Sequence, residues 1–534
     1  MRWLRAEQVI GRVRHKIVSP RVSASFAVSR RPVAANWNLG ARRTASLTHD
    51  GIPVFLNTKG TLVDPSDWND PAVSRLWLYN LHYFDDLNAE DASERAALHR
   101  ELIQRWIDEN PAPIGTGWEP YPCSLRIVNW IKWALSGNDM CPEWQSSLAV
   151  QTDWLSKNLE WHLLGNHLFA NAKALVFAAL FFEGPSAEGW LNSGLGILER
   201  ELPEQVLADG GQFERSPMYH AIALEDLIDL INLAECFEGS IKTSVIVHWR
   251  ETATKMLRWA AVMQHPDEEI SLFNDSAFGI APAPSELSDY AGRLGLELPP
   301  AASAGLKILE DSGYVRAEAG DAVLLADVGE IGPDYLPGHS HADTLSFELS
   351  LYGDRWFVDT GCSTYEVGEE RLRQRSTAAH NTVTVDGQDS SEVWSSFRVA
   401  RRARPINVDY TTVADSFTVS GAHDGYKRLK GRATHSRVFQ LTASRLDISD
   451  FLDGQFDSAV ANFLLHPEVE VDESGEAIVL RRGAYLARLA FLGGRPEIQT
   501  ATWHPEFGIS IATRKITVRF FGAELAMTLT WNRE

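Results

Sequence analysis

The sequence predicts a multidomain protein of two successive fold classes, an all-helical domain followed by an antiparallel β-sandwich. Apolar residues recur at helical spacing from about Pro71 to about Phe273, without alternating runs between the repeats. From Gly313 onward the pattern changes to short alternating runs separated by turn residues. A chain of 534 residues is also longer than one core usually organises. We therefore expect an N-terminal extension at 1–60, a helical domain at 61–300 and a β-sandwich domain at 301–534.

The helical elements follow one another with short connections. Leu98, Leu102 and Trp106 form an apolar stripe that stops at Asn110-Pro111, a helix-ending pair. The stretch 124–137 repeats this pattern and places Gly137 where a C-terminal cap belongs. Further helices are expected at 161–184, 216–237 and 243–266. Such a series is typical of an α/α toroid or a stacked helical array.

The second half begins after a connecting segment. Residues 282–305 are rich in Pro, Ala and Gly, which indicates a linker between domains. Beyond it, strand-like runs flank Gly320-Asp321 and Gly353-Asp354, the pattern of β-hairpins. Similar runs continue to the end of the chain, so we expect a large antiparallel sandwich.

Composition excludes some partners and leaves others open. The net charge of −21 argues against nucleic acid, which requires a basic surface, but a local basic cleft would still bind an anionic glycan. Most of the 18 Trp residues are expected in the core, and a minority would stack on sugars. The cysteines are scattered without a paired spacing, so we expect reduced thiols: Cys123, Cys141, Cys236 and Cys362.

The N-terminus resembles a basic amphipathic helix. Trp3, Val9, Ile10, Val13 and Ile17 alternate with arginines and Lys16, and the stretch lacks the apolar core of a secretory signal. Docking against another domain is the preferred interpretation, and peripheral contact with a membrane is the alternative. Without a recognisable leader we expect a cytoplasmic location, while a periplasmic or membrane-associated one stays open.

Polar residues interrupt two of the predicted helices. In 161–184, His162 and Asn166 are spaced to share a helix face, as are His167 and Asn171. Buried polar groups need partners, so this pattern fits either a network between helices or a ligand site.

In the second helix, Ser216 is a suitable N-cap and Pro217 fits the first helical position, which places Tyr219 and His220 in the first turn. We expect the helix dipole to lower the pKa of Tyr219 modestly and Glu214 and Arg215 to orient it. A buried tyrosine bonded to a carbonyl is the alternative.

Two further clusters lie in the β half. A Pro-Gly turn leads through His339 and His341 into a strand, and two histidines so spaced are uncommon as core residues. A positive stretch follows, which is a candidate anion site or a solvated basic face: Arg371, Arg373, Arg375, His380, Arg398, Arg401, Arg402 and Arg404.

Several longer motifs recur in a known order along the chain: NHLFANAKALVFAALFF, DGGQFERSPMYH, GHSHADTLSFEL with WFVDTG behind it, and AAHNTVTVDG. NLHYFDDL, GWEPYPCSLRIVNW and LFNDS accompany them in the helical half. With these motifs the chain resembles the heparinase II/III family of polysaccharide lyases. The resemblance implies an N-terminal α/α toroid, a C-terminal antiparallel β-sandwich and β-elimination on a uronate-containing anionic glycan, without an organic cofactor.

The resemblance also implies roles for particular residues. Asn166 would neutralise the uronate carboxylate, Tyr219 would serve as acid or base, and His339 would be the second proton-transfer group. A structural metal, zinc by preference, would be held by His341, Asp359 and His380, although His380 could instead belong to the active site. Gln212 stands where similar sequences often carry His and receives no role. Substrate contacts are expected from His167, Glu214, Arg215, Arg371 and Arg375.

Two other functions remain open from the sequence. A glycoside hydrolase on a helical toroid needs two opposed carboxylates, for which Glu214 and Asp209 are available. That reading leaves the Asn, Tyr and His clusters unexplained. A non-catalytic glycan-binding or assembly protein of the same fold is the other alternative, and it predicts that the Tyr and His clusters are buried and bonded to one another.

Overall fold

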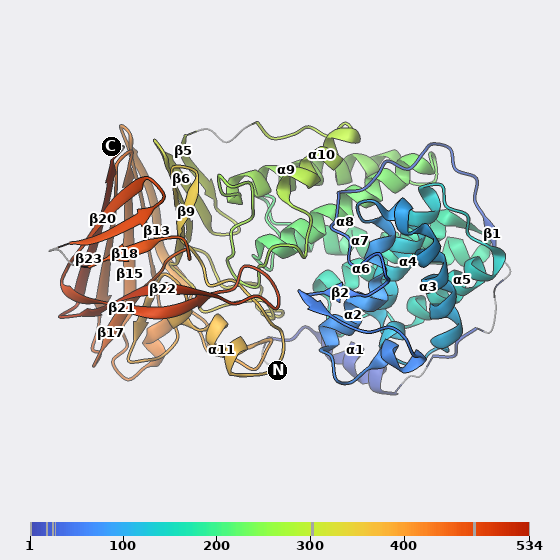
Figure 1. The fold of residues 1–534 in the computed structure, drawn as a ribbon, viewed down its shortest axis with the longest axis horizontal. Coiled ribbons are helices and arrows are strands. Elements are labelled where there is room, and N and C mark those ends of the chain that lie inside the picture. The colour runs from blue at the N-terminus through green and yellow to red at the C-terminus, as the bar shows by residue number, and fades with distance from the viewer. Residues whose placement is uncertain are drawn as a thin grey trace.

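The structure, a computed structural model, describes residues 3–17, 20–23, 26, 28–300, 304–473 and 477–532. A helix-rich part precedes a part built from antiparallel sheets, and the two lie side by side (Figure 1). The predicted order of fold classes is therefore confirmed. Among the described residues, no helix is long and apolar enough to cross a membrane.

The helices of the first part follow the apolar stripes of the sequence. They are α1 (Ala6–Ile17), α2 (Arg75–Tyr83), α3 (Ala96–Glu109), α4 (Pro120–Leu135), α5 (Pro142–Lys157), α6 (Gly165–Phe181), α7 (Pro185–Gln205), α8 (Pro217–Cys236), α9 (Thr243–Met263) and α10 (Pro284–Arg293). Five of them, α4, α5, α7, α8 and α10, begin with proline, whose fixed φ suits the first helical position and whose missing N–H is not needed there. Helix α6 is buried over most of its length, which places it in the core of this part.

Two predictions about the helices were wrong. Helix α6 begins at Gly165, because Leu164 has a left-handed backbone (φ +66°) that a right-handed helix does not accept. His162 therefore lies in the preceding turn, where it stacks on His15, and it shares no helix face with Asn166. The expected linker at 282–305 contains helix α10, because Tyr290 is fully buried and its hydroxyl donates to Asp229 of α8.

The second part contains three larger sheets. A five-stranded sheet has the order β5 (Gly305–Leu309), β6 (Tyr314–Ala319), β7 (Ala322–Asp327), β8 (Phe347–Leu351) and β9 (Asp354–Phe357). An eight-stranded sheet has the order β13 (Pro405–Val413), β14 (Ser416–His423), β15 (Thr434–Thr442), β16 (Arg445–Asp453), β23 (Glu524–Asn532), β20 (Tyr485–Leu492), β19 (Ile478–Arg482) and β18 (Glu470–Asp472). A four-stranded sheet has the order β10 (Val383–Val385), β17 (Ala459–Leu464), β22 (Ile511–Phe520) and β21 (Gly494–Trp503).

Burial along the strands explains how the layers are stacked. Strands β15 and β16 alternate between buried and accessible residues, as expected when one face of a sheet is covered. Strands β7 and β8 are buried throughout. They belong to the five-stranded sheet, whose strands β5, β6 and β9 lie between the helices and the other sheets (Figure 1). The short elements are β1 (Ser29–Arg30), β2 (Val54–Phe55), β3 (Thr58–Lys59), β4 (Phe182–Glu183), β11 (Val393–Trp394), β12 (Arg398–Val399) and α11 (Glu369–Arg375).

A shared apolar cluster joins the two parts. Trp259 of α9 packs against Tyr314 of β6, and its indole N–H donates to Ser312 at 2.9 Å. Phe273 and Leu325 also belong to this cluster. Close packing of large aromatic side chains fixes the relative position of the two parts, so residues from both can form one site.

Helix α1 docks against both parts through its polar face. The buried Gln8 side chain donates to the carbonyls of Leu163 and Tyr335 at 3.4 Å each. Trp3 lies under the guanidinium of Arg402 in the β part. The apolar stripe faces outward, with Val9 41%, Ile10 66%, Val13 52% and Ile17 76% exposed. Both sequence interpretations of this helix thus retain a physical basis.

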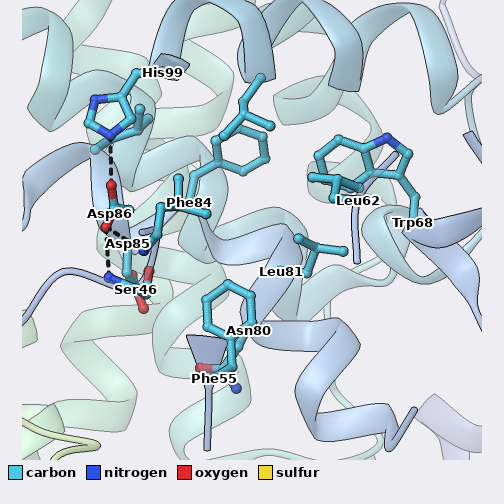
Figure 2. Close-up of a pocket in the computed structure, with 13 residues that line it drawn as sticks. Ser46, Phe55, Leu62, Trp68, Asn80, Leu81, Phe84, Asp85, Asp86 and His99 are labelled. Carbon is cyan, nitrogen blue, oxygen red and sulfur yellow. Dashed lines mark hydrogen bonds and ion pairs between the residues drawn. The ribbon is translucent and has the colours of Figure 1, made fainter. Parts of the chain in front are cut away.

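A small pocket in the helical part has no room for a sugar. It is lined mainly by apolar side chains, among them Phe55, Trp68 and Phe84, with Asp86 and His99 at one side (Figure 2). Its volume of about 20 Å³ suits about one water molecule.

Candidate functional site

Side chains from both parts meet at the N-terminal ends of helices α6 and α8. Tyr219 of α8 and His339, from the loop between β7 and β8, have ring centroids 3.9 Å apart. Tyr219 is 8% exposed and the His339 side chain 13%, so each ring keeps only an edge open to solvent. Glu214 lies beside this pair, with Oε2 at 3.7 Å from His339 Nε2.

The N-cap of α8 fixes the position of Tyr219. Ser216 Oγ accepts from the Tyr219 amide at 3.2 Å and donates to the Asp275 carbonyl at 2.7 Å, so the predicted cap is confirmed. The Tyr219 hydroxyl lies 3.1 Å from the Tyr365 hydroxyl. Sequence reasoning missed Tyr365, because a single tyrosine in an irregular segment carries no local pattern.

The expected lowering of the Tyr219 pKa was wrong. Burial raises this pKa well above its usual range, because the tyrosinate anion would lose its solvation. The hydrogen bond from Tyr365 opposes this effect without cancelling it. Tyr219 therefore holds its proton at neutral pH, which fits a proton donor better than a base.

Glu214 lies between Asn166 and His339 rather than against Tyr219. Its buried carboxylate accepts from the backbone N–H of Asn166 and from Gln212 Nε2 at 3.2 Å. Burial raises the pKa of Glu214, and the nearby His339 and Gln212 reduce that rise. The predicted roles of Arg215 in orienting Tyr219 and contacting substrate are not supported, because its guanidinium donates to the carbonyls of Glu330 and Asp311.

The first turn of α6 presents Asn166 and His167. His167 Nδ1 lies 3.0 Å from Glu160 Oε1 and its ring packs on Tyr121 at 4.4 Å. Asn171 donates to the other Glu160 oxygen at 3.0 Å, so His167 and Asn171 share a face as predicted. Burial alone would lower the pKa of His167, but the Glu160 carboxylate outweighs it and raises the pKa. Within the part of the chain that the structure describes, the Asn166 side-chain amide has no hydrogen-bond partner and is half-buried.

Two arginines that we expected at the substrate are interior residues. Arg371 of α11 is fully buried and forms an ion pair with Asp275. Arg375 is also fully buried, and it donates to the carbonyls of Ser340, Ser395 and Ser396. Their N–H groups are bound to protein acceptors, so these arginines stabilise the residues around the site rather than contact a ligand. Four other arginines of this stretch are paired with carboxylates in the described structure: Arg373 with Glu370, Arg401 with Glu392, and Arg402 and Arg404 with Asp334.

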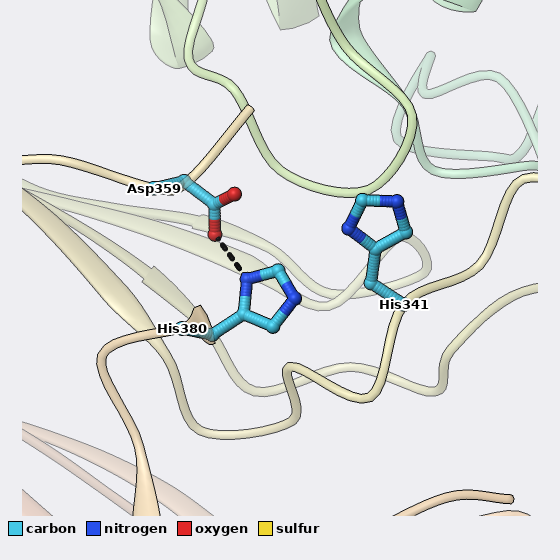
Figure 3. A group of neighbouring side chains, drawn as sticks. All are labelled: His341, Asp359 and His380. Carbon is cyan, nitrogen blue, oxygen red and sulfur yellow. Dashed lines mark hydrogen bonds and ion pairs between the residues drawn. The ribbon is translucent and has the colours of Figure 1, made fainter. Parts of the chain in front are cut away.

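His341, Asp359 and His380 form a buried group (Figure 3). Their potential ligand atoms lie within 4.8 Å of one another. His380 Nδ1 is 2.8 Å from Asp359 Oδ2, and burial raises the Asp359 pKa to about 6 despite this contact. His341 Nδ1 and His380 Nε2 are buried without a hydrogen-bond partner in the described structure. Two imidazole nitrogens with free lone pairs and one carboxylate are ligands suited to a divalent ion such as zinc.

The family comparisons cover both halves of the chain. A model described as "Heparinase II/III N-terminus" matches residues 85–287, and one described as "Heparinase II/III-like, C-terminal" matches residues 301–532. A heparin-sulfate lyase of Bacteroides stercoris is 27% identical over 333 residues, which are 58% of this chain and 47% of the relative. One of Pedobacter heparinus is 28% identical over 272 residues, 46% of this chain and 40% of the relative. The matched segments thus span less than half the length of these relatives.

Solved structures share the fold. A crystal structure of heparinase III superposes with a TM-score of 0.71 at 18% identity and covers 88% of this chain and 79% of its own. A chondroitin AC lyase of Streptomyces coelicolor A3 superposes with a TM-score of 0.51 at 10% identity over 86% of this chain and 74% of its own. These likenesses agree with the architecture described above, a helical part followed by antiparallel sheets.

Proposed function

Because the chain belongs to the heparinase II/III family, we propose that it is a polysaccharide lyase that cleaves a uronate-containing glycosaminoglycan by β-elimination. The observation that carries this proposal is that Glu214 lies beside both His339 and the Asn166 backbone, while the His339 ring packs on Tyr219. The half-buried Asn166 amide has no hydrogen-bond partner among the described residues, and the Tyr219 and His339 rings pack on each other. This is the set of groups that an elimination requires.

The reaction places three demands on the site. The C5 proton of a uronate is weakly acidic, so the negative charge that develops on the adjacent carboxylate has to be stabilised. A base then removes the C5 proton, and an acid protonates the glycosidic oxygen as the bond to C4 breaks. The products are a new chain end and an unsaturated uronate.

We assign each demand to a residue. The Asn166 amide donates to the uronate carboxylate. Tyr219, whose pKa is raised by burial, keeps its proton until it transfers it to the leaving oxygen. His339 accepts the C5 proton at Nε2, because its Nδ1 is already bound to Asp275. Glu214 orients the Asn166 backbone and faces His339 Nε2.

The structure bears differently on the two alternative functions, the glycoside hydrolase and the non-catalytic glycan-binding protein. The hydrolase alternative is disfavoured, because the Asp209 carboxylate that it requires accepts from the Ser312 amide and hydroxyl at 2.7 and 2.8 Å. A non-catalytic glycan-binding protein gains support from the low exposure of Tyr219 and from its bond to Tyr365. Both alternatives predict that no unsaturated uronate is formed.

Incubation with a panel of anionic polysaccharides tests the proposal. The panel contains heparan-type, chondroitin-type and alginate-type chains, and ultraviolet absorbance follows the conjugated double bond of the unsaturated product. We expect absorbance to rise with a glycosaminoglycan. Binding without any absorbance change on every member would support the non-catalytic alternative.

We further propose that His341, Asp359 and His380 hold a structural zinc or similar ion, which ties the His339 loop to the strand ends behind it. Protein that is purified without a chelator is expected to contain about one metal ion per chain. His380→Ala should lose that ion and unfold at a lower temperature, because a site formed only in the folded state stabilises it. His435→Ala removes another buried His–Asp pair and serves as the control, which should retain the ion. Equal ion content in His380→Ala and wild type would rule the site out.

We also propose that helix α1 contacts an anionic membrane surface. Its outward apolar stripe is flanked by Arg12, Arg14 and Lys16 in a chain of net charge −21, a contrast that favours anionic lipid. Wild-type protein should cosediment with vesicles that contain anionic lipid more than with purely zwitterionic ones. Ile17→Glu should abolish the difference, whereas Val413→Glu, at an exposed position of β13, should not. Absence of sedimentation with either vesicle type would refute the contact.

A further inference from the structure

Asp275 is the most highly connected carboxylate of the site, although it lies in an irregular segment after α9. It is fully buried and accepts from His339 Nδ1 at 2.9 Å and from His341 Nε2 at 2.8 Å. Arg371 binds the same carboxylate with both terminal nitrogens, one of them at 2.6 Å. One side chain thus joins the proposed proton-transfer residue, a proposed metal ligand and a buried cation.

The segment that carries Asp275 is fixed to both parts of the protein. The Asp275 carbonyl accepts from Ser216, the N-cap of α8, and the Asp275 amide donates to the His339 carbonyl at 3.0 Å. The preceding Asn274 accepts from the His341 amide at 2.9 Å and donates to the Arg215 carbonyl at 3.0 Å. The Asp275 carboxylate is therefore held in place independently of its own contacts.

The charge of Asp275 determines where the protons of the two histidines lie. Arg371 donates to both carboxylate oxygens from its two terminal nitrogens, and this buried bidentate ion pair keeps Asp275 in its charged form. An ionised carboxylate only accepts hydrogen bonds. The ring nitrogens that face it, His339 Nδ1 and His341 Nε2, must therefore both carry protons.

Opposite nitrogens of the two rings are left with free lone pairs. His339 keeps Nε2, which faces Glu214 at 3.7 Å on the side of Tyr219. His341 keeps Nδ1, a buried atom without a partner among the described residues, beside Asp359 and His380. These are the two lone pairs that a proton acceptor and a metal ligand need.

We propose that Asp275 is a positioning residue that fixes His339 and His341 in opposite tautomers, so that one carboxylate prepares both the proton acceptor and the metal site. The effect on His339 rests on the proposed lyase function, whereas the effect on His341 does not. Arg371 keeps Asp275 ionised and thereby acts on both histidines indirectly. Loss of the Asp275 charge is expected to disturb metal binding and catalysis together.

Asp275→Asn tests this coupling, because an amide has one accepting oxygen and one donating nitrogen. The nitrogen has to face a histidine N–H or Arg371, so at least one ring must lose its bond or change tautomer. We expect zinc affinity to fall by about 10- to 100-fold, as when a group that orients a metal ligand is removed. We also expect kcat to fall by at least about 10²-fold with little change in KM, as when a histidine tautomer is no longer fixed.

Selective ¹⁵N-histidine NMR of the wild-type protein supplies a test that requires no variant. At neutral pH it should find His339 protonated at Nδ1 and His341 protonated at Nε2. The opposite tautomer at either ring would overturn the proposal, even if Asp275→Asn fails to fold. If the protein showed no lyase activity, the lyase proposal would fail, but the histidine tautomers and the zinc affinity would still test the role of Asp275.

Asp450→Asn is the matched control. Asp450 of β16 is a buried carboxylate that accepts from His435 Nε2 at 2.7 Å and from Arg437, but it lies in the eight-stranded sheet. Its loss should lower stability while zinc affinity and kcat stay within about twofold of wild type. The proposal fails if Asp275→Asn folds and retains both wild-type tautomers and wild-type zinc affinity.

Discussion

Tyr219→Phe is expected to lower kcat by about 10²-fold or more while KM changes little. The phenylalanine ring keeps the contact with His339, so a substrate still finds the same surface. What is lost is the only proton that the Tyr219 side chain offers to the leaving oxygen. Initial rates of unsaturated product formation over a range of substrate concentrations measure both constants.

The same substitution has a structural cost that has to be separated from the chemical one. Removal of the hydroxyl leaves the half-buried Tyr365 hydroxyl without its partner, which costs about 1 kcal/mol of stability. Denaturant unfolding of each variant measures this cost. Tyr335→Phe, which removes a hydroxyl bonded to Glu204 beside α1, should keep wild-type kcat. A folded Tyr219→Phe protein that eliminates at the wild-type rate would contradict the mechanism.

Asn166→Ala is expected to lower kcat by about 10²- to 10³-fold, because one donor to the developing carboxylate charge is lost. The half-buried amide bonds no other residue in the described structure, so its removal should cost little stability. The backbone N–H that binds Glu214 remains in place. Steady-state rates and thermal unfolding are to be compared on the same preparations.

Asn158→Ala serves as the control for this variant. Asn158 follows α5 in the same part of the protein, and its side-chain amide donates to the Trp154 carbonyl at 2.7 Å. It should change stability slightly and leave kcat unaltered. If Asn166→Ala and Asn158→Ala have equal rates, Asn166 has no role in charge stabilisation.

The change of fold class along the chain was predictable because it rests on periodicity. Helices such as α3 follow Leu98, Leu102 and Trp106, and β15 alternates as a half-covered strand should. Helix α10 was missed because its Pro- and Ala-rich stretch has the composition of a linker. Only burial of Tyr290 against Asp229 reveals that it packs as a helix.

The candidate site was only partly predictable. Short motifs identified Tyr219, His339 and His341, because unusual polar residues cluster there. Asp275 lies in the LFNDS motif but received no role, and Tyr365 lies in no motif, since each acts through a partner that is distant in sequence, Arg371 and Tyr219 respectively. The positive stretch that includes Arg371 and Arg375 misled the sequence interpretation, because charge in a sequence does not tell whether a side chain points inward.

The central claim is that cleavage proceeds by elimination, and the fate of water tests it most directly. The protein is incubated with its preferred glycosaminoglycan in heavy-oxygen water, and the masses of the products are measured by mass spectrometry. Elimination adds no water, so we predict that the new chain ends carry no heavy oxygen and that one product of each cleavage contains an unsaturated uronate. Heavy oxygen at the new reducing ends, with saturated products, would show hydrolysis and contradict the account.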